Sequence, residues 1–225
     1  MARGFFITGT DTDVGKTTVA LGLMAAFKEA GLTVAAFKPV SAGCIQTENG
    51  LRNDDAVQLM QKASVNLPYD VVNPYAFEPA IAPHIAAAEH YIEINLDVIV
   101  KAYQKISAKV DIVIVEGAGG WLVPINDNET MADVAKVLDL DVVTVIGIRL
   151  GCLNHALLTS QSITASGLNH RGWIANHLAI ATERATENIT ALRARIPAPL
   201  LDEVPYGNNL LHLKNSVRIL SQNIP

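Results

Sequence analysis

The sequence has 225 residues, with 17 Lys and Arg against 22 Asp and Glu, and a formal net charge of −5. Half of the residues are hydrophobic and 17% are charged, a balance that predicts one sizeable α/β domain over residues 1–225 and excludes a disordered chain. Because nucleic acids and anionic membranes attract basic surfaces, the acidic balance argues against both as partners.

The first predicted elements surround a glycine-rich run. The apolar residues 5–8 predict a buried strand, and Val19, Leu23 and Phe27 recur on one side of a predicted helix. Between them lies Thr8 to Thr18, with Gly15, Lys16 and Thr17 at the helix start. A strand, a glycine turn, Lys-Thr and a helix predict a phosphate-binding loop, because several N–H groups and the positive helix end then face one anion.

Lys16 adds a full positive charge for the outer phosphates, and the Thr17 hydroxyl suits a magnesium ligand. Gly9 and Gly15 enclose five residues where the usual pattern has four, so Thr10 stands where glycine is expected. The spacing predicts a different backbone path at the start of the loop. The alternative is an ordinary glycine turn entering a helix, but the flanking strand and the Lys-Thr pair favour nucleotide binding.

Polar residues follow the second predicted strand, residues 33–37. Lys38 and Pro39 come directly after it, and Lys38 alone is equally a solvated edge residue; beside a phosphate site it predicts a second cation on the transferring group. Further on, Asn53 or Asp54 is the expected cap of a helix. Asp55 lies in the first turn of that helix, and spacing alone leaves open whether it is a second carboxylate for the metal.

Residues 64–83 contain four prolines and predict an irregular excursion within one domain rather than a linker. A helix over 95–109 and a strand over 111–115 follow. The strand is predicted to end at Glu116, whose carboxylate suits magnesium, and the glycines after it allow close approach to a ligand. The alternative is a surface glutamate in a hairpin-like turn.

The strongest strand pattern, residues 142–148, leads into residues 150–156, which open a helix whose N–H groups suit another anion, such as a carboxylate. There His155 is more typical of a structural hydrogen-bond partner, and Cys152 of an inert small residue. Strands over 173–176 and 199–204 flank a helix over 182–195. Strands apolar on both faces, alternating with amphipathic helices, predict a three-layer parallel sheet with functional groups at the strands' carboxyl ends.

Cys44 and Cys152 are the only cysteines, and neither has metal-ligand spacing. Two unpaired thiols are typical of a reducing cytoplasm. The glycine-rich run begins so near residue 1 that we expect no cleavable signal, and the longest apolar stretches are too short to span a bilayer. We therefore expect a cytoplasmic protein.

Taken together, these segments resemble the dethiobiotin synthetase family, which has the P-loop NTPase fold. The resemblance runs nearly end to end, through motifs at residues 8–17, 38–40, 50–55, 73–75, 83–84, 116–121, 150–156, 172–176 and 197–200. The five-residue glycine spacing is usual in that family. The resemblance implies an ATP- and Mg2+-dependent ligase of biotin biosynthesis that forms the ureido ring of dethiobiotin from 7,8-diaminononanoate and CO2. It also implies a carbamate, a carbamic-phosphoric anhydride, release of ADP and phosphate, and a homodimer.

The resemblance also implies roles for individual residues. Lys16 and Lys38 are the expected catalytic cations, and Thr17, Asp55 and Glu116 the expected magnesium ligands. The diamine is expected to contact Thr12, Lys38, Ser41 and Ala42, with its carboxylate reaching Gly151, Cys152, Leu153 and Asn154 across the dimer interface. The expected ATP-binding residues are Asp13, Val14, Gly15, Lys16, Thr17, Thr18, Asp55, Glu116, Gly117, Ala118, Gly119, Asn176, His177, Pro205, Tyr206 and Gly207.

Two features depart from the family pattern. Ala42 stands where the family usually has Ser or Thr before the glycine, so either a hydroxyl contact to the diamine is lost or Ser41 replaces it. The segment that contacts adenine varies widely in the family, which weakens the assignments of Tyr206 and Gly207.

Two other functions remain open. A switch-type ATPase of the chromosome-partitioning or division-site-placement class shares the architecture, but it carries a second lysine where this chain has Asp11. A nucleotide-binding module without catalysis would leave Lys38, Asp55 and Glu116 without a role.

Overall fold

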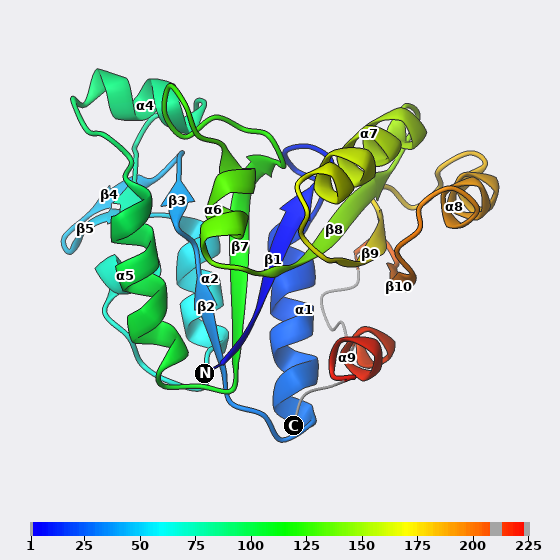
Figure 1. Cartoon of the computed structure of the whole chain (residues 1–225), viewed down its shortest axis with the longest axis horizontal. Coiled ribbons are helices and arrows are strands. Elements are labelled where there is room, and N and C mark those ends of the chain that lie inside the picture. Colours follow the sequence, from blue (N-terminus) through cyan, green and yellow to red (C-terminus); the bar gives the residue numbers. More distant parts are fainter. Residues whose placement is uncertain (1, 208–212, 223–225) are drawn as a thin grey trace.

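The computed structural model describes residues 2–207 and 213–222, and a six-stranded parallel sheet lies at its centre (Figure 1). The strand order is β10-β9-β8-β1-β7-β2, with every neighbouring pair parallel. The predicted α/β class is therefore confirmed, and all six predicted strands are present. Their bounds are β1 Arg3–Gly9, β2 Val34–Phe37, β7 Ile112–Gly120, β8 Asp141–Ile148, β9 His170–His177 and β10 Leu200–Val204.

Both faces of the sheet are covered by helices, because its strands are apolar on both sides. Successive side chains of a strand point to opposite faces. In β1, Phe5 and Ile7 accordingly pack in one buried cluster and Phe6 packs in another. The helices on the first face are α1 Lys16–Glu29, α2 Asp54–Lys62 and α9 Lys214–Leu220, and those on the second are α5 Leu96–Ser107, α6 Met131–Val137, α7 Cys152–Ala165 and α8 Ala185–Arg193.

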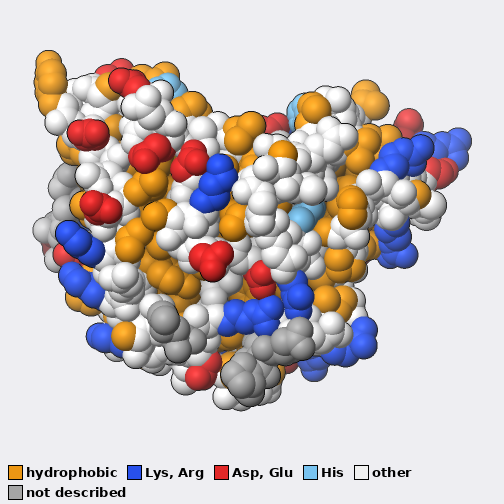
Figure 2. All heavy atoms as spheres, viewed as in Figure 1, with side chains coloured by type: hydrophobic (Ala, Val, Ile, Leu, Met, Phe, Trp, Pro, Cys, Tyr) orange, Lys and Arg blue, Asp and Glu red, His pale blue; other side chains and the backbone are white. Residues whose placement is uncertain are grey.

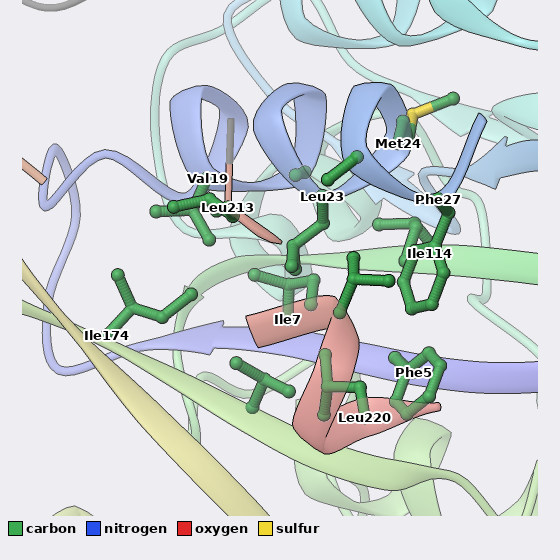
Figure 3. Packing of buried hydrophobic residues seen from close by; sticks show 14 of the residues in the cluster. Phe5, Ile7, Val19, Leu23, Met24, Phe27, Ile114, Ile174, Leu213 and Leu220 are labelled. Carbon is green, nitrogen blue, oxygen red and sulfur yellow. The ribbon is translucent and has the colours of Figure 1, made fainter. Parts of the chain in front are cut away.

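The predicted apolar side of α1 is confirmed. Val19, Leu23 and Phe27 are all buried against the sheet, and the rings of Phe27 and Phe5 stack with centroids 5.6 Å apart. Figure 3 shows these side chains meeting residues from β1, β7 and β9, with Leu213 and Leu220 closing the cluster from the C-terminal part of the chain. Helix α1 is thus held along its length, which fixes the position of its first turn.

The chain between β2 and β7 forms smaller elements beside the carboxyl ends of the strands. Strand β3 Val40–Ser41 pairs in parallel with β6 Tyr75–Ala76, and β4 Ile45–Thr47 pairs with β5 Gly50–Arg52 in a hairpin. The short helix α3 Tyr69–Val72 begins after Pro68, and α4 Pro83–Glu89 begins at Pro83. The segment predicted as irregular, residues 64–83, therefore includes α3 and β6.

Strand β7 is longer than predicted. It was expected to end at Glu116, but it continues to Gly120, so the alternative of a hairpin-like turn at the glycines was wrong. Pairing with β1 carries the strand onward: Ile7 lies opposite Glu116, and Gly9 lies opposite Gly120 after a register shift. The glycines therefore lengthen β7 at its carboxyl end, beside the loop that follows β1. Glu116 lies within the strand and not at its end.

Among the described residues, no helix combines the length and the apolar character needed to cross a membrane.

Candidate functional site

The loop between β1 and α1 has the conformation of an anion-binding turn. Gly15 is the N-cap of α1 with φ of 90°, and Asp13 also has a positive φ, of 56°. The Asn176 amide, from β9, donates to the Val14 carbonyl over 2.8 Å. A Cβ on Gly15 would lie 2.1 Å from Asn176 Nδ2, so glycine is required here both for space and for backbone conformation.

The first turn of α1 brings two functional side chains to this loop. Lys16 is buried, and its Nζ donates to the Asp11 carbonyl over 3.1 Å, across the loop. The Thr17 hydroxyl donates to Glu116 Oε1 over 2.9 Å. The loop after β1 and the middle of β7 therefore form one site.

Lys38 lies at the centre of this site. It follows β2, is 4% exposed, and its Nζ lies 2.6 Å from Glu116 Oε1 and 3.0 Å from Asp55 Oδ2. Asp55 comes from the first turn of α2, whose N-cap is Asn53, as predicted. Glu116 is fully buried. The alternatives of a solvated edge lysine and a surface glutamate were therefore wrong, and three side chains distant in sequence meet at one point.

The two ammonium groups have opposite pKa shifts. For Lys16, burial lowers the pKa from 10.5, and the positive charge of Lys38 lowers it further. Burial acts on Lys38 in the same direction, but Glu116 and Asp55 outweigh it and hold the pKa above 10.5. For Asp55, burial alone would raise the pKa, but Lys38 and Lys16 lower it on balance. A triphosphate bound beside Lys16 would place negative charge next to its ammonium group, which favours the charged form of Lys16.

A pocket of about 960 Å³ opens over this cluster. Figure 2 shows the outline of the molecule dipping at its upper edge, between the parts that Figure 1 labels α4 and α7. A volume of this size is at the upper end for small-molecule sites. The lining includes Thr12, Asp13, Gly15, Lys16, Thr17, Thr18, Lys38, Ser41, Ala42, Asn53, Asp55, Glu116, Ala118 and Gly119, together with residues 80–83 and Val123.

The oxygen atoms at this point fit a magnesium ion. Glu116 Oε2 is buried and has no hydrogen-bond partner among the described residues, an arrangement that is costly for a carboxylate unless a cation or a donor is supplied. Magnesium prefers a few carboxylate oxygens together with phosphate and water. The described residues contain no group of three or more His, Cys, Asp or Glu side chains placed for a metal, so Thr17, Asp55 and Glu116 would hold the ion only with nucleotide oxygens.

The other predicted residues lie around this pocket or beyond it. The Ser41 side chain is buried, and its hydroxyl donates to Asn73 over 2.7 Å. Cys152 is buried where α7 begins, in a segment outside the pocket. Toward β10, His177 Nε2 lies 4.0 Å from Glu203. Pro205, Tyr206 and Gly207 are exposed.

Sequence reasoning missed two features of the site. Asn73 is 2% exposed, and its side-chain amide donates to the carbonyl of Lys38. In the sequence this residue stood out only as part of the motif at 73–75, and it was given no role in the site. Arg149 follows β8 and pairs with Asp11, which links the loop after β1 to the start of α7. An arginine directly after a buried strand is the same signal that singled out Lys38.

Comparison with known proteins gives similarity over nearly the whole chain. The family described as an AAA domain matches residues 3–212. An ATP-dependent dethiobiotin synthetase BioD from Pseudomonas paraeruginosa (strain DSM 24068 / PA7) is 50% identical over 202 residues, 89% of each chain. The enzyme of the same name from Aeromonas hydrophila subsp. hydrophila is 49% identical over 212 residues, 94% of each chain.

Among solved structures, the MinC:MinD cell division protein complex of Aquifex aeolicus is similar in fold. Its matching chain has a TM-score of 0.63 and 15% identity, and the match covers 100% of this chain and 98% of that one. Identity this low shows a shared fold alone. It confirms the expectation that division-site-placement ATPases share this architecture.

Proposed function

Since this chain belongs to the ATP-dependent dethiobiotin synthetase family, we propose that it is a ligase of biotin biosynthesis that closes a ureido ring on 7,8-diaminononanoate. CO2 would supply the ring carbon, and ATP, on which the relatives depend by name, would drive the closure. The observation that carries this proposal is the buried cluster of Lys38, Glu116 and Asp55 beside Lys16 in a large pocket. A site that only held a nucleotide would have no use for a second buried ammonium group at that point.

The reaction would start with a carbamate. One amine of the diamine forms an N–C bond to CO2 and loses a proton, which leaves a carbamate anion. The pocket wall formed by Thr12, Ser41 and Ala42 is where we place the diamine, next to Lys38. The Lys38 ammonium would attract and orient the carbamate oxygens, because it is held charged by its two carboxylate partners.

Phosphoryl transfer would follow at the junction of the two lysines. A carbamate oxygen attacks the γ-phosphorus of ATP, the bond from that phosphorus to the bridging oxygen breaks, and ADP leaves. The backbone N–H groups of residues 13–18 would hold the phosphates, with Lys16 neutralising the outer charge. Lys38 would stabilise the charge that spreads over the transferring group.

Ring closure would complete the reaction. The second amine attacks the carbonyl carbon of the mixed anhydride, the carbon–oxygen bond to phosphate breaks, and phosphate leaves with that oxygen. The amine loses a proton as the ureido ring closes. No covalent bond to the protein forms, so positioning and charge neutralisation supply the rate.

Thr17, Asp55 and Glu116 would hold Mg2+, which when bound neutralises charge on the β- and γ-phosphates. Glu116 Oε2, buried and without a hydrogen-bond partner among the described residues, supports this assignment. Residues 117–119, Asn176, His177 and 205–207 are the proposed surroundings of the nucleotide base, and Asn176 already contacts the loop at Val14.

The remaining proposals concern the assembly. We propose a homodimer in which residues 151–154 of one protomer receive the carboxylate of the diamine bound to the other, because these residues form the N-terminal turn of α7 and lie outside their own chain's pocket. We propose a cytoplasmic location, because two free buried cysteines suit a reducing compartment.

The test is to identify the product. Purified protein with ATP, Mg2+, bicarbonate and 7,8-diaminononanoate is expected to give dethiobiotin, ADP and phosphate in equal amounts by mass spectrometry. Omission of the diamine should suppress ADP formation. Steady ATP hydrolysis that ignores the diamine, with no ring product, would instead favour a switch-type ATPase.

A further inference from the structure

A buried amide between α3 and β6 connects the two sides of the site. Asn73 Nδ2 donates to the Lys38 carbonyl over 2.7 Å and to the Tyr75 carbonyl over 3.2 Å. Its Oδ1 accepts from the Ser41 hydroxyl over 2.7 Å and from the Tyr69 hydroxyl over 2.8 Å. Carbonyls only accept, so they fix which end of the amide faces Lys38, and both ends of the amide are fully used.

The same network reaches the helix that carries Asp55. The Tyr69 hydroxyl accepts the backbone N–H of Asn53 over 2.7 Å. Asn53 is the N-cap of α2: its Oδ1 accepts from the Ala56 N–H over 3.2 Å, and its Nδ2 donates to the Ala42 carbonyl over 3.3 Å. A continuous path of hydrogen bonds therefore runs from the backbone of Lys38 to the first turn of α2.

This path of hydrogen bonds stabilises the separation between Lys38 and Asp55, on which the proposed phosphoryl transfer depends. The backbone of Lys38 is held from both sides, because its N–H donates to the Val72 carbonyl over 2.8 Å and its carbonyl accepts from Asn73. Asn73 is 2% exposed, and buried hydrogen bonds of this kind resist displacement by water. Helix α2 packs against β2, and this path of hydrogen bonds adds a directed link between the end of β2 and the start of α2.

We propose that Asn73, with Ser41 and Tyr69, is a positioning network that sets the place of Lys38 relative to Asp55 for the phosphoryl-transfer step. The proposal rests on the proposed function, because it assigns the network to that reaction. These three residues act through Lys38 and Asp55, so a loss of the network should lower kcat. Since the Ser41 proton is directed to Asn73, the Ser41 hydroxyl has only a lone pair to offer the diamine.

Tyr69→Phe is the mildest test of the network. It removes the hydroxyl and keeps the ring, which lies under the Arg52 guanidinium at 4.1 Å. Tyr103→Phe is the matched control, since it removes a largely buried hydroxyl on α5, beside Gly4 at the opposite end of β1. We expect Tyr69→Phe to lower kcat about 10-fold with the KM values for ATP and diamine within about twofold, since a small misplacement at a reacting centre has effects of this size. Tyr103→Phe should stay within about twofold in kcat.

A double-mutant cycle separates positioning from general destabilisation. If the network acts through Lys38, Tyr69→Phe should cost at most about threefold in a Lys38→Leu background, because the group being positioned is gone. An equal loss in both backgrounds would overturn the proposal, as would a kcat for Tyr69→Phe within twofold of the wild-type value.

Crystal structures of wild type and Tyr69→Phe give a readout independent of activity. The distance from Lys38 Nζ to Asp55 Oδ2 is 3.0 Å in wild type and is expected to exceed hydrogen-bond range in the variant. An unchanged distance overturns the network. A wild-type protein that makes no dethiobiotin would instead overturn the proposed function, and this distance would still decide the structural claim.

Discussion

Replacing Lys38 by leucine removes the ammonium at the centre of the site and leaves a shorter, apolar side chain in its place. Two contacts disappear, at 2.6 Å to Glu116 and at 3.0 Å to Asp55. We expect kcat for dethiobiotin formation to fall by at least ~100-fold, because one preorganised donor to a developing anion typically contributes about 2.7–4 kcal/mol. Nucleotide binding should change little, since Lys16 and the loop backbone remain.

The substitution also affects folding stability, and the assay has to separate this from catalysis. Removing one partner of a buried ion pair costs about 3–5 kcal/mol. Here the cost should be near the lower end, because the Thr17 hydroxyl still donates to Glu116 and the Asp55 side chain is 40% exposed. About 3 kcal/mol corresponds to a fall in Tm of about 6–12 °C for a chain of this length.

The assay is single-turnover product formation at a temperature below the melting transition of the variant, with nucleotide affinity measured alongside. Lys101→Leu is the matched control, an exposed lysine on α5 outside the pocket, and it should retain activity within about twofold. Near-normal turnover of Lys38→Leu, with the protein folded and nucleotide bound, would refute the role of Lys38 in the mechanism.

Two further predictions concern the pocket wall and a partly buried histidine, His170. Ala42→Ser restores the hydroxyl that the family usually has and should leave diamine affinity equal or better, measured as KM for the diamine; a large loss would mean that the backbone follows another path there. Burial lowers the pKa of His170 from 6.5 to about 4. Between these pH values the folded state therefore binds fewer protons than the unfolded state. The stability that is present above pH 6.5 is lost as the pH falls toward 4, and the loss is roughly 3 kcal/mol. Urea unfolding of His170→Gln should show a smaller loss over that range, and an undiminished loss would contradict this.

The sequence predicted the sheet well, because its strands are short runs that are apolar on both faces, and such runs are typical of buried parallel strands. It predicted Lys38 and Glu116 for a related reason: charged groups next to buried strands meet at one edge of a parallel sheet. Lys16 was predicted from the glycine-rich loop at the start of a helix. The end of β7 was missed, since glycines are typical of turns and rare in strands, and only pairing with β1 continues the strand to Gly120.

The network around Asn73 was not predictable from local pattern. Asn73 and Tyr69 lie in a segment with four prolines, and their contacts with Lys38, Ser41 and Asn53 join parts of the chain that are 16 to 35 positions apart. A polar amide in such a segment is usually solvated, and only the fold buries this one. Hydrogen bonds between distant loops leave no periodicity in the sequence, which is why Asn73 was given no role.

The central claim is that Lys16 and Lys38 converge where the γ-phosphoryl group meets the carbamate. A crystal structure with a non-hydrolysable ATP analogue, Mg2+ and the diamine tests it most directly. We expect both Nζ atoms to lie within hydrogen-bond distance of the γ-phosphate oxygens, with Lys38 also reaching the amine that forms the carbamate. Either ammonium group pointing away from that junction, outside the reach of its rotamers, would contradict the account.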